Sequence, residues 1–193
     1  MKKMASVDFF KSLRNERHQF YLVVCEQSDA DTGKYVCGGG LDLGLNDAGM
    51  EEAKKLARRF KKNPLKLKRM ISCPELRTIQ MADILHDEMR LKLALWREFA
   101  DQFMGEYEGK PLSPSMDFSS PPSGETLESF TLRVRLGLER LLKEKDLILL
   151  VTHLRVAKVI FKLMQIEPSI AAAGKMFAVD WPEGEGIAHA REV

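Results

Sequence analysis

The sequence is poor in cysteine, with three among 193 residues, and none of the three forms a Cys-x-x-Cys pair. An odd, small number of cysteines excludes a disulfide framework of the kind that small secreted domains use. The missing spacing also gives no support for a structural zinc site. We therefore expect Cys25, Cys37 and Cys73 to be reduced thiols.

Long apolar runs are also missing. No stretch approaches the roughly 20 apolar residues that a membrane-spanning helix needs. The basic start, Met1 to Met4, is followed by charged residues that interrupt any signal-peptide core. We expect a cytoplasmic protein that does not associate with a membrane.

There is no large excess of one charge, because 30 Lys and Arg face 28 Asp and Glu and leave a net charge of +2. A basic stretch at Lys54 to Lys68 contains Leu56, Ala57 and Phe60 at helical spacing. This spacing favours the solvated face of an amphipathic helix, and no motif combining aromatic and basic residues accompanies it. We expect no nucleic-acid partner.

The chain does contain short buried-looking strands. Three unalternating apolar runs are Phe20 to Val24, Leu67 to Ile71 and Leu147 to Val151, which is typical of strands covered on both faces. Helical periodicity follows over these segments: 47–62, 75–89, 125–143 and the residues after His153. This alternation predicts an α/β three-layer sandwich with a mainly parallel sheet and helices on both faces.

At this length we expect one domain over residues 1–193. Residues 1–19 precede the first strand as an N-terminal extension. The Pro-, Ser- and Gly-rich segment 100–124 is long for a loop in a compact domain, which is typical of a lid or binding loop. The tail after Lys175 predicts a strand, a Pro-Glu-Gly turn and a returning strand.

Three reactive side chains lie where strands end. Cys25, Cys73 and His153 each follow one of the apolar runs. Ligands of open α/β sheets bind beyond the carboxyl ends of the strands. We therefore expect these side chains to share one rim of the sheet, where two cysteines and one histidine would also be an acceptable ligand set for catalytic zinc.

The order of the motifs resembles that of the histidine phosphatase superfamily, from about Phe20 to Trp181. The segments that carry the resemblance are "GGGLDLGLNDAGMEEAKKLA", "ISCPELRTIQMA", "LWREFADQFMGEYEG", "SGETLESFTLR" and "LILLVTH". The second resembles the family's Ser-Ser-Pro-Leu-x-Arg-Ala-x-Gln-Thr-Ala helix start. The resemblance implies a phosphoglycerate mutase-like fold and a phosphate pocket.

The resemblance also assigns roles to residues. It implies that Arg77 and His153 bind phosphate and that Glu98 is the acid, although Glu106 or Glu108 could equally reach the site. Arg133 matches the later arginine of the fourth segment. Arg155, after His153-Leu154, joins the candidate phosphate-binding residues.

The first motif departs from the family, which has Leu-Val-Arg-His-Gly where this chain has Leu22-Val23-Val24-Cys25-Glu26. The arginine that clamps phosphate is replaced by Val24, and the histidine that attacks it is replaced by Cys25. A thiol attacks as the thiolate, which nearby positive charge favours. Losing an arginine and gaining Glu26, whose direction stays open, favours the neutral thiol.

Three functions remain open. The first is a catalytically inactive or impaired homologue with a binding or regulatory role. The second is an active phosphomonoesterase or mutase with Cys25 as nucleophile, Arg77 and His153 on the phosphate and Glu98 as acid. The third is a metal-dependent hydrolase at the same rim. We predict no cofactor, and a phosphorylated small molecule, phosphoprotein or other anion as partner.

Overall fold

The computed structural model describes residues 18–25, 35–62, 64–181 and 188–193. They build one six-stranded sheet in the order β3-β2-β4-β1-β5-β6. The strands are β1 (His18–Val24), β2 (Arg69–Ser72), β3 (Lys92–Leu95), β4 (Ile148–Thr152), β5 (Met176–Trp181) and β6 (His189–Glu192). The pairs β1·β4, β2·β4 and β2·β3 are parallel, whereas β5 and β6 run antiparallel to their neighbours.

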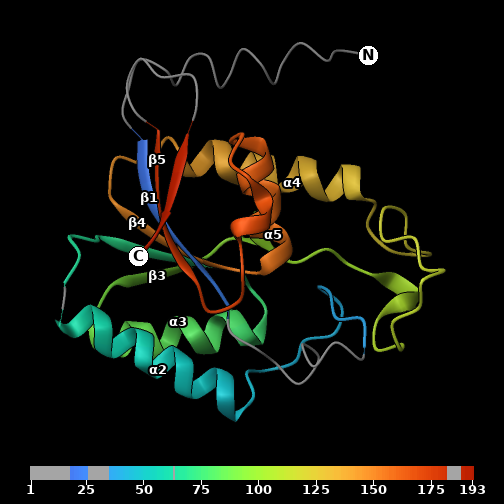
Figure 1. The fold of residues 1–193 in the computed structure, drawn as a ribbon, viewed down its shortest axis with the longest axis horizontal. Helices are drawn as coiled ribbons and strands as arrows, with labels where there is room; N and C mark the ends of the chain where they lie inside the picture. Colours follow the sequence, from blue (N-terminus) through green and yellow to red (C-terminus); the bar gives the residue numbers. More distant parts are fainter. Residues whose placement is uncertain (1–17, 26–34, 63, 182–187) are drawn as a thin grey trace.

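Helices cover both faces of the sheet (Figure 1). They are α2 (Asp47–Lys62), α3 (Leu76–Met89), α4 (Leu127–Leu141) and α5 (Leu154–Leu163). Helices α2 and α3 lie on one face, and α4 and α5 lie on the other. The predicted three-layer α/β sandwich with a mainly parallel sheet is confirmed.

Strand β1 shows why the apolar runs do not alternate. Leu22 and Val24 belong to the hydrophobic core under α4 and α5, whereas Val23 belongs to the core under α2 and α3. All three side chains are fully buried. Because both faces of the strand are covered, successive positions in it are apolar.

The sequence analysis did not predict β3. This strand pairs with β2 at the edge of the sheet, and its residues are only half-buried or exposed. The tail does form a strand and a returning strand, β5 and β6, although the Pro-Glu-Gly turn between them lies outside the described residues. In the described parts of the chain, no helix is long and apolar enough to cross a bilayer.

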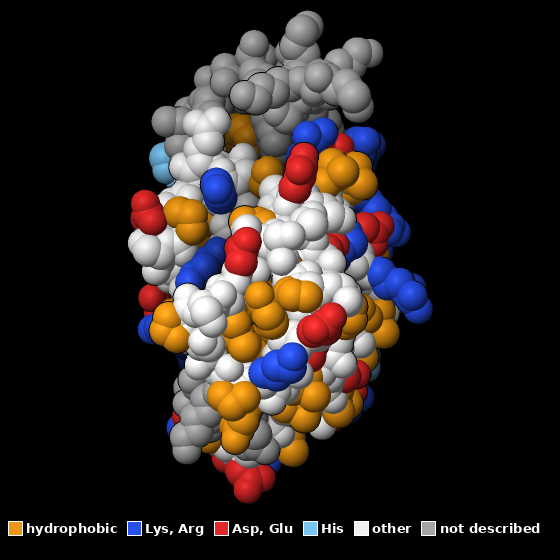
Figure 2. All heavy atoms as spheres, turned by 90° about the vertical axis from the view of Figure 1, so that its right-hand side faces the viewer, with side chains coloured by type: hydrophobic (Ala, Val, Ile, Leu, Met, Phe, Trp, Pro, Cys, Tyr) orange, Lys and Arg blue, Asp and Glu red, His pale blue; other side chains and the backbone are white. Residues whose placement is uncertain are grey.

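Segment 100–124 combines a fully buried side chain, Met104, with hydrogen bonds inside the segment and to the residue that follows it. The buried Gln102 amide donates hydrogen bonds to the carbonyl oxygens of Phe118 and Glu125. Two of its large apolar side chains, Phe103 and Leu112, are exposed. On the face formed by the right-hand side of Figure 1, hydrophobic side chains lie scattered among acidic and basic ones (Figure 2).

Candidate functional site

A cavity of about 160 Å³ lies beyond the carboxyl ends of β1 and β4. Its lining residues are Cys25, Cys37, Arg77, Asp101, His153, Leu154, Arg155 and Ala173. The register of the parallel pair places Val24 opposite Thr152, and the Cys25 N–H donates to the Thr152 carbonyl at 2.7 Å. The residues that follow these two strands, Cys25 and His153, therefore lie at one rim, as the sequence indicated.

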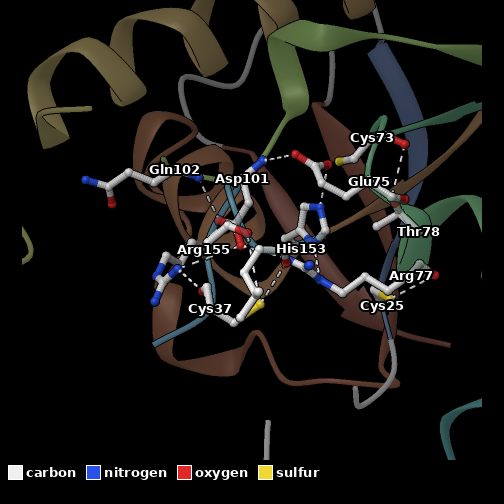
Figure 3. A network of polar contacts seen from close by, with 12 residues as sticks. Cys25, Cys37, Cys73, Glu75, Arg77, Thr78, Asp101, Gln102, His153 and Arg155 are labelled. Atoms are coloured by element: carbon white, nitrogen blue, oxygen red, sulfur yellow. Dashed lines mark hydrogen bonds and ion pairs between the residues drawn. The ribbon is translucent and has the colours of Figure 1, made fainter. Parts of the chain in front are cut away.

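Both ring nitrogens of His153 are bonded to protein groups (Figure 3). The Nε of Arg77 donates to His153 Nδ1 at 3.2 Å, and His153 Nε2 lies 2.8 Å from Glu75 Oε2. An arginine can only donate, so Nδ1 is the acceptor and Nε2 carries the hydrogen that Glu75 accepts. His153 is thereby held in one tautomer with no ring N–H left for a ligand.

Glu75 is a buried carboxylate at the N-cap of α3. Its second oxygen accepts the N–H of Asp101 at 2.9 Å. Burial alone would raise the pKa of Glu75, but the hydrogen bonds that it accepts from His153 and from the Asp101 N–H outweigh burial, so its pKa lies below the ordinary value. Glu75 therefore stays ionised at neutral pH.

Two of the three guanidinium nitrogens of Arg77 are bonded inside the protein. Besides the bond to His153, its Nη2 forms a 3.1 Å salt bridge with Asp101 Oδ2. Its Nη1 is buried and has no hydrogen-bond partner among the described residues. Burial would lower the pKa of Arg77, but Asp101 and other neighbouring groups outweigh burial and raise it, so the guanidinium stays charged.

Arg155 belongs to the first turn of α5 and lies at the cavity edge. Its Nη1 donates to the Cys37 carbonyl at 2.8 Å and lies 3.7 Å from Asp101 Oδ2. The side chain is 36% exposed, in contrast to the buried Arg77. Asp101 thus faces both guanidinium groups of the cavity.

The thiols are placed differently from one another. Cys25 is 6% exposed, and its Sγ–H donates to the backbone carbonyl of Arg77 at 3.4 Å. Cys73 is fully buried, does not line the cavity, and donates to the Phe99 carbonyl at 2.7 Å. Burial, and then the charge of Glu75, raise the pKa of the Cys73 thiol well above its ordinary value.

The fold does not bring together the three possible zinc ligands that the sequence suggested, which were Cys25, Cys73 and His153. In the described part of the chain, the potential ligand atoms of Cys73, Glu75 and His153 lie within 4.8 Å of one another, without Cys25. Zinc binds the thiolate. Because Cys73 is held as the neutral thiol and Glu75 and His153 are bonded to each other, this cluster fits a hydrogen-bond network better than a metal site.

A family model described as histidine phosphatase superfamily (branch 1) matches residues 26–176. The chain belongs to the histidine phosphatase superfamily. The match begins directly after Cys25, at the motif where the sequence departs from the family. No curated protein matches the chain.

Solved structures of several proteins share the fold of this chain. An Escherichia coli protein provisionally named alpha-ribazole-5'-P phosphatase is 19% identical with a TM-score of 0.77, and the match covers 91% of this chain and 95% of that one. A Thermus thermophilus phosphoglycerate mutase is 24% identical with a TM-score of 0.71, covering 91% and 98%. A mycobacterial glucosyl-3-phosphoglycerate phosphatase is 16% identical with a TM-score of 0.73, covering 92% and 98%.

This histidine phosphatase homologue has a second substitution that the sequence analysis did not single out. Glu75 follows Cys73-Pro74, at the place where the family's Ser-Ser-Pro-Leu motif has leucine. A leucine cannot accept a hydrogen bond from His153. The signal was present in the sequence as a charged residue at an apolar motif position, but its partner is 78 residues away.

The predicted acid, Glu98, does not line the cavity. Its carboxylate pairs with Arg140 of α4 at 3.0 Å, because the 3₁₀ turn at Arg97–Phe99 (η3) directs it toward that helix. Among the described residues, the acid that lines the cavity is Asp101, three residues later. Arg133 fixes this segment by donating to several of its backbone carbonyls, those of Arg97, Glu98, Ala100 and Asp101.

The two alternative acids also lie elsewhere. Glu108 accepts the N–H groups of Gly38, Gly40 and Met104, each at 2.9 Å. Glu106 accepts from the Ser123 hydroxyl on the surface. Glu26, whose direction the sequence left open, lies outside the described residues. The structure thus brings Cys25, Arg77, His153 and Arg155 together and adds Asp101 and Glu75.

Proposed function

We propose that this chain is a catalytically inactive histidine phosphatase homologue that acts as a binding or regulatory protein. Its ligand would be a phosphorylated small molecule, a phosphoprotein or another anion that enters the cavity. The observation that carries the proposal is that both ring nitrogens of His153 are bonded, one to Glu75 and one to Arg77.

Loss of the first motif supports the same conclusion. A hydrogen bond between arginine and phosphate contributes about 1.5–3 kcal/mol, and Val24 cannot make one. The Val24 side chain is fully buried in the core under α4 and α5 and does not line the cavity. A phosphoryl group would have to be held by Arg77 and Arg155, and both of these already face Asp101.

Cys25 is a weak candidate for the nucleophile. Its thiol donates its hydrogen to a backbone carbonyl, which favours the neutral form over the thiolate. A base that accepts this hydrogen must have a nitrogen or oxygen available, yet the imidazole of His153 has both nitrogens occupied. The hydrogen bonds of His153 therefore leave its ring unavailable as the base for Cys25.

The test is hydrolysis of a generic aryl phosphate by purified protein from pH 5 to 9. Cys25→Ala and Cys37→Ala are measured in parallel, because both cysteines line the cavity and only the first occupies the nucleophile position. We expect no turnover above the background that all three proteins share. Turnover that Cys25→Ala abolishes and Cys37→Ala retains would identify an active cysteine enzyme and contradict the proposal.

The cytoplasm is the location that goes with this proposal. None of the three cysteines forms a disulfide, which is the state that a reducing compartment maintains. Two of them line the cavity, so an oxidising compartment would expose the proposed binding site to thiol oxidation. A fluorescent fusion of the full chain, imaged in living cells, tests this location.

A further inference from the structure

We propose that the cavity selects a small monoanion, such as a carboxylate or sulfonate, over a dianion such as sulfate or a phosphate monoester. This inference rests on the proposed function, because it names the ligand of a site that binds without turning over. It follows from which donors the described residues leave available and from the charges that face them.

One nitrogen of Arg77 is a donor without a partner among the described residues. Arg77 is 5% exposed and lines the cavity, and its Nη1 is buried with no hydrogen-bond partner among the described residues. A buried charged group with an unmade hydrogen bond is costly, so an acceptor in the cavity would be favourable. The other two nitrogens of this guanidinium are bonded to His153 and Asp101. Nη1 is therefore the nitrogen of Arg77 that no described residue engages, and a two-nitrogen grip on phosphate would have to share Nη2 with Asp101.

Helix α5 begins at the cavity. Leu154 and Arg155 form the first turn of α5, and both line the cavity. The N-cap residue, His153, makes no side-chain cap hydrogen bond. An uncapped helix N-terminus favours an anion through its backbone N–H groups and its dipole. Together with Arg77 Nη1 and the half-exposed Arg155, it supplies donors to a single anionic group.

The charged side chains of the site balance one another. Two guanidinium groups, Arg77 and Arg155, are matched by two carboxylates, Asp101 and Glu75. Asp101 lines the cavity beside both guanidinium groups, and its carboxylate repels each negative charge of a ligand. The cost of removing an ion from water grows with the square of its charge, about fourfold for a dianion. With no net positive charge among these four side chains to offset it, the second charge is unfavourable.

The volume of the cavity also limits the ligand. A cavity of about 160 Å³ is similar to one of roughly 150 Å³ that can hold benzene. Part of its lining is apolar or weakly polar, namely Cys25, Leu154 and Ala173. A carboxylate or sulfonate with a short apolar group therefore fits both the volume and the lining.

The experiment compares methanesulfonate with sulfate, two tetrahedral sulfur anions that differ in charge and in one methyl-for-oxygen exchange. Acetate and benzoate test the carboxylate class. Binding is followed by amide chemical-shift titration at constant ionic strength. We expect the monoanions to shift amides at the start of α5 and to bind at least about tenfold more tightly than sulfate. Equal or tighter binding of sulfate, or no binding by any monoanion, would overturn the inference.

Asp101→Asn is the matched variant, with Asp87→Asn on the exposed side of α3 as its control. Removing the Asp101 charge should raise the affinity for sulfate about tenfold relative to methanesulfonate, and the control should leave the ratio unchanged. If Asp101→Asn does not fold, the wild-type comparison still decides. Turnover of aryl phosphate would contradict the proposed function whatever the anion preference, whereas a preference for sulfate without turnover would contradict only the present inference.

Discussion

The Nε of Arg77 donates a hydrogen bond to the Nδ1 of His153 at 3.2 Å. Both residues occupy motif positions that the family resemblance assigns to phosphate binding, and here they bind each other. Glu75 accepts from the other ring nitrogen of His153, and Asp101 accepts from a second nitrogen of Arg77. The four side chains form one buried network, which leaves Arg77 Nη1 as the donor without a partner among the described residues.

Glu75→Gln tests this network through the pH dependence of stability. The pKa of Glu75 is lowered in the folded protein, so its ionised form stabilises the fold above the ordinary value of 4.5, and this contribution is lost as pH falls through the lowered folded value. At pH 7 the free energy of unfolding of the variant should be about 1–3 kcal/mol smaller than that of wild type. The difference should shrink below pH 4.5.

Urea unfolding at pH 7 and pH 3.5 measures both quantities, with about 1 pH unit separating the acid condition from the ordinary carboxyl value. Asp87→Asn is the control, because this α3 carboxylate is exposed and should change stability by less than about 0.5 kcal/mol. A stability difference between Glu75→Gln and wild type that stays constant across this pH range would show that the Glu75 charge does not support the fold.

Glu108→Gln tests how segment 100–124 is attached to the Gly-rich stretch before α2. Glu108 accepts three backbone N–H groups, from Gly38, Gly40 and Met104. Hydrogen bonds to a charged group contribute about 1.5–3 kcal/mol, and the amide cannot accept at both positions, so we expect a loss of that order. Glu106→Gln is the control because, within the described residues, the Glu106 carboxylate accepts from the exposed Ser123 hydroxyl alone.

Hydrogen exchange locates the effect. In Glu108→Gln the amides of Gly38, Gly40 and Met104 should exchange faster than in Glu106→Gln, while those of β4 should be unchanged. The glycines themselves are required here, since a Cβ at Gly38 would lie 2.3 Å from the Gln102 carbonyl oxygen. Equal exchange in the two variants would mean that packing, and not the Glu108 carboxylate, holds the two segments together.

The cysteines should differ in reactivity. Burial and the nearby Glu75 raise the pKa of Cys73 well above its ordinary value, so almost no thiolate is present at pH 8. Cys37 is only partly buried. In the native protein, iodoacetamide should modify Cys37 and leave Cys73 intact, whereas in urea both should react. Peptide mass spectrometry distinguishes them, and native labelling of Cys73 at the rate of Cys37 would be inconsistent with its buried hydrogen bonds.

Local signals made much of the fold predictable. The predicted helix at 47–62 coincides with α2, because its apolar stripe is strong and Asn46 caps it by accepting the Gly49 N–H. The run at Phe20 to Val24 is buried on both faces and could only be a central strand. Strand β3 escaped prediction because it is a four-residue edge strand without a fully buried face.

The site was less predictable because its contacts are long-range. Cys25 and His153 each follow a parallel strand, and this position was enough to predict that they lie at one rim of the sheet. Whether Glu98 or Asp101 lines the cavity depends on one 3₁₀ turn and on Arg133. The hydrogen bond from Arg133 to the Ala100 carbonyl spans 33 residues of the chain. The pairing of Glu75 with His153 joins the start of α3 to the end of β4, and no local pattern encodes it.

The last prediction separates the two departures from the family. Val24→Arg, Cys25→His and Glu26→Gly together restore the first motif, but they leave His153 bonded to Glu75. We expect this triple variant to remain near background with aryl phosphate. Adding Glu75→Leu restores the family's residue after Cys73-Pro74 and removes the acceptor, which frees His153 Nε2 for a phosphate oxygen.

The quadruple variant should therefore gain hydrolysis that neither the triple variant nor Glu75→Leu alone shows. Positioned hydrogen-bond donors on a developing negative charge contribute about 10²–10³-fold in similar sites, and a gain of that order is expected. Circular dichroism confirms that each variant is folded, since Val24→Arg places a charged side chain at the edge of the core that Val24 now fills. If the triple variant is as active as the quadruple one, the Glu75–His153 hydrogen bond does not prevent phosphate hydrolysis, and the changes in the first motif alone would account for the inactivity that we propose.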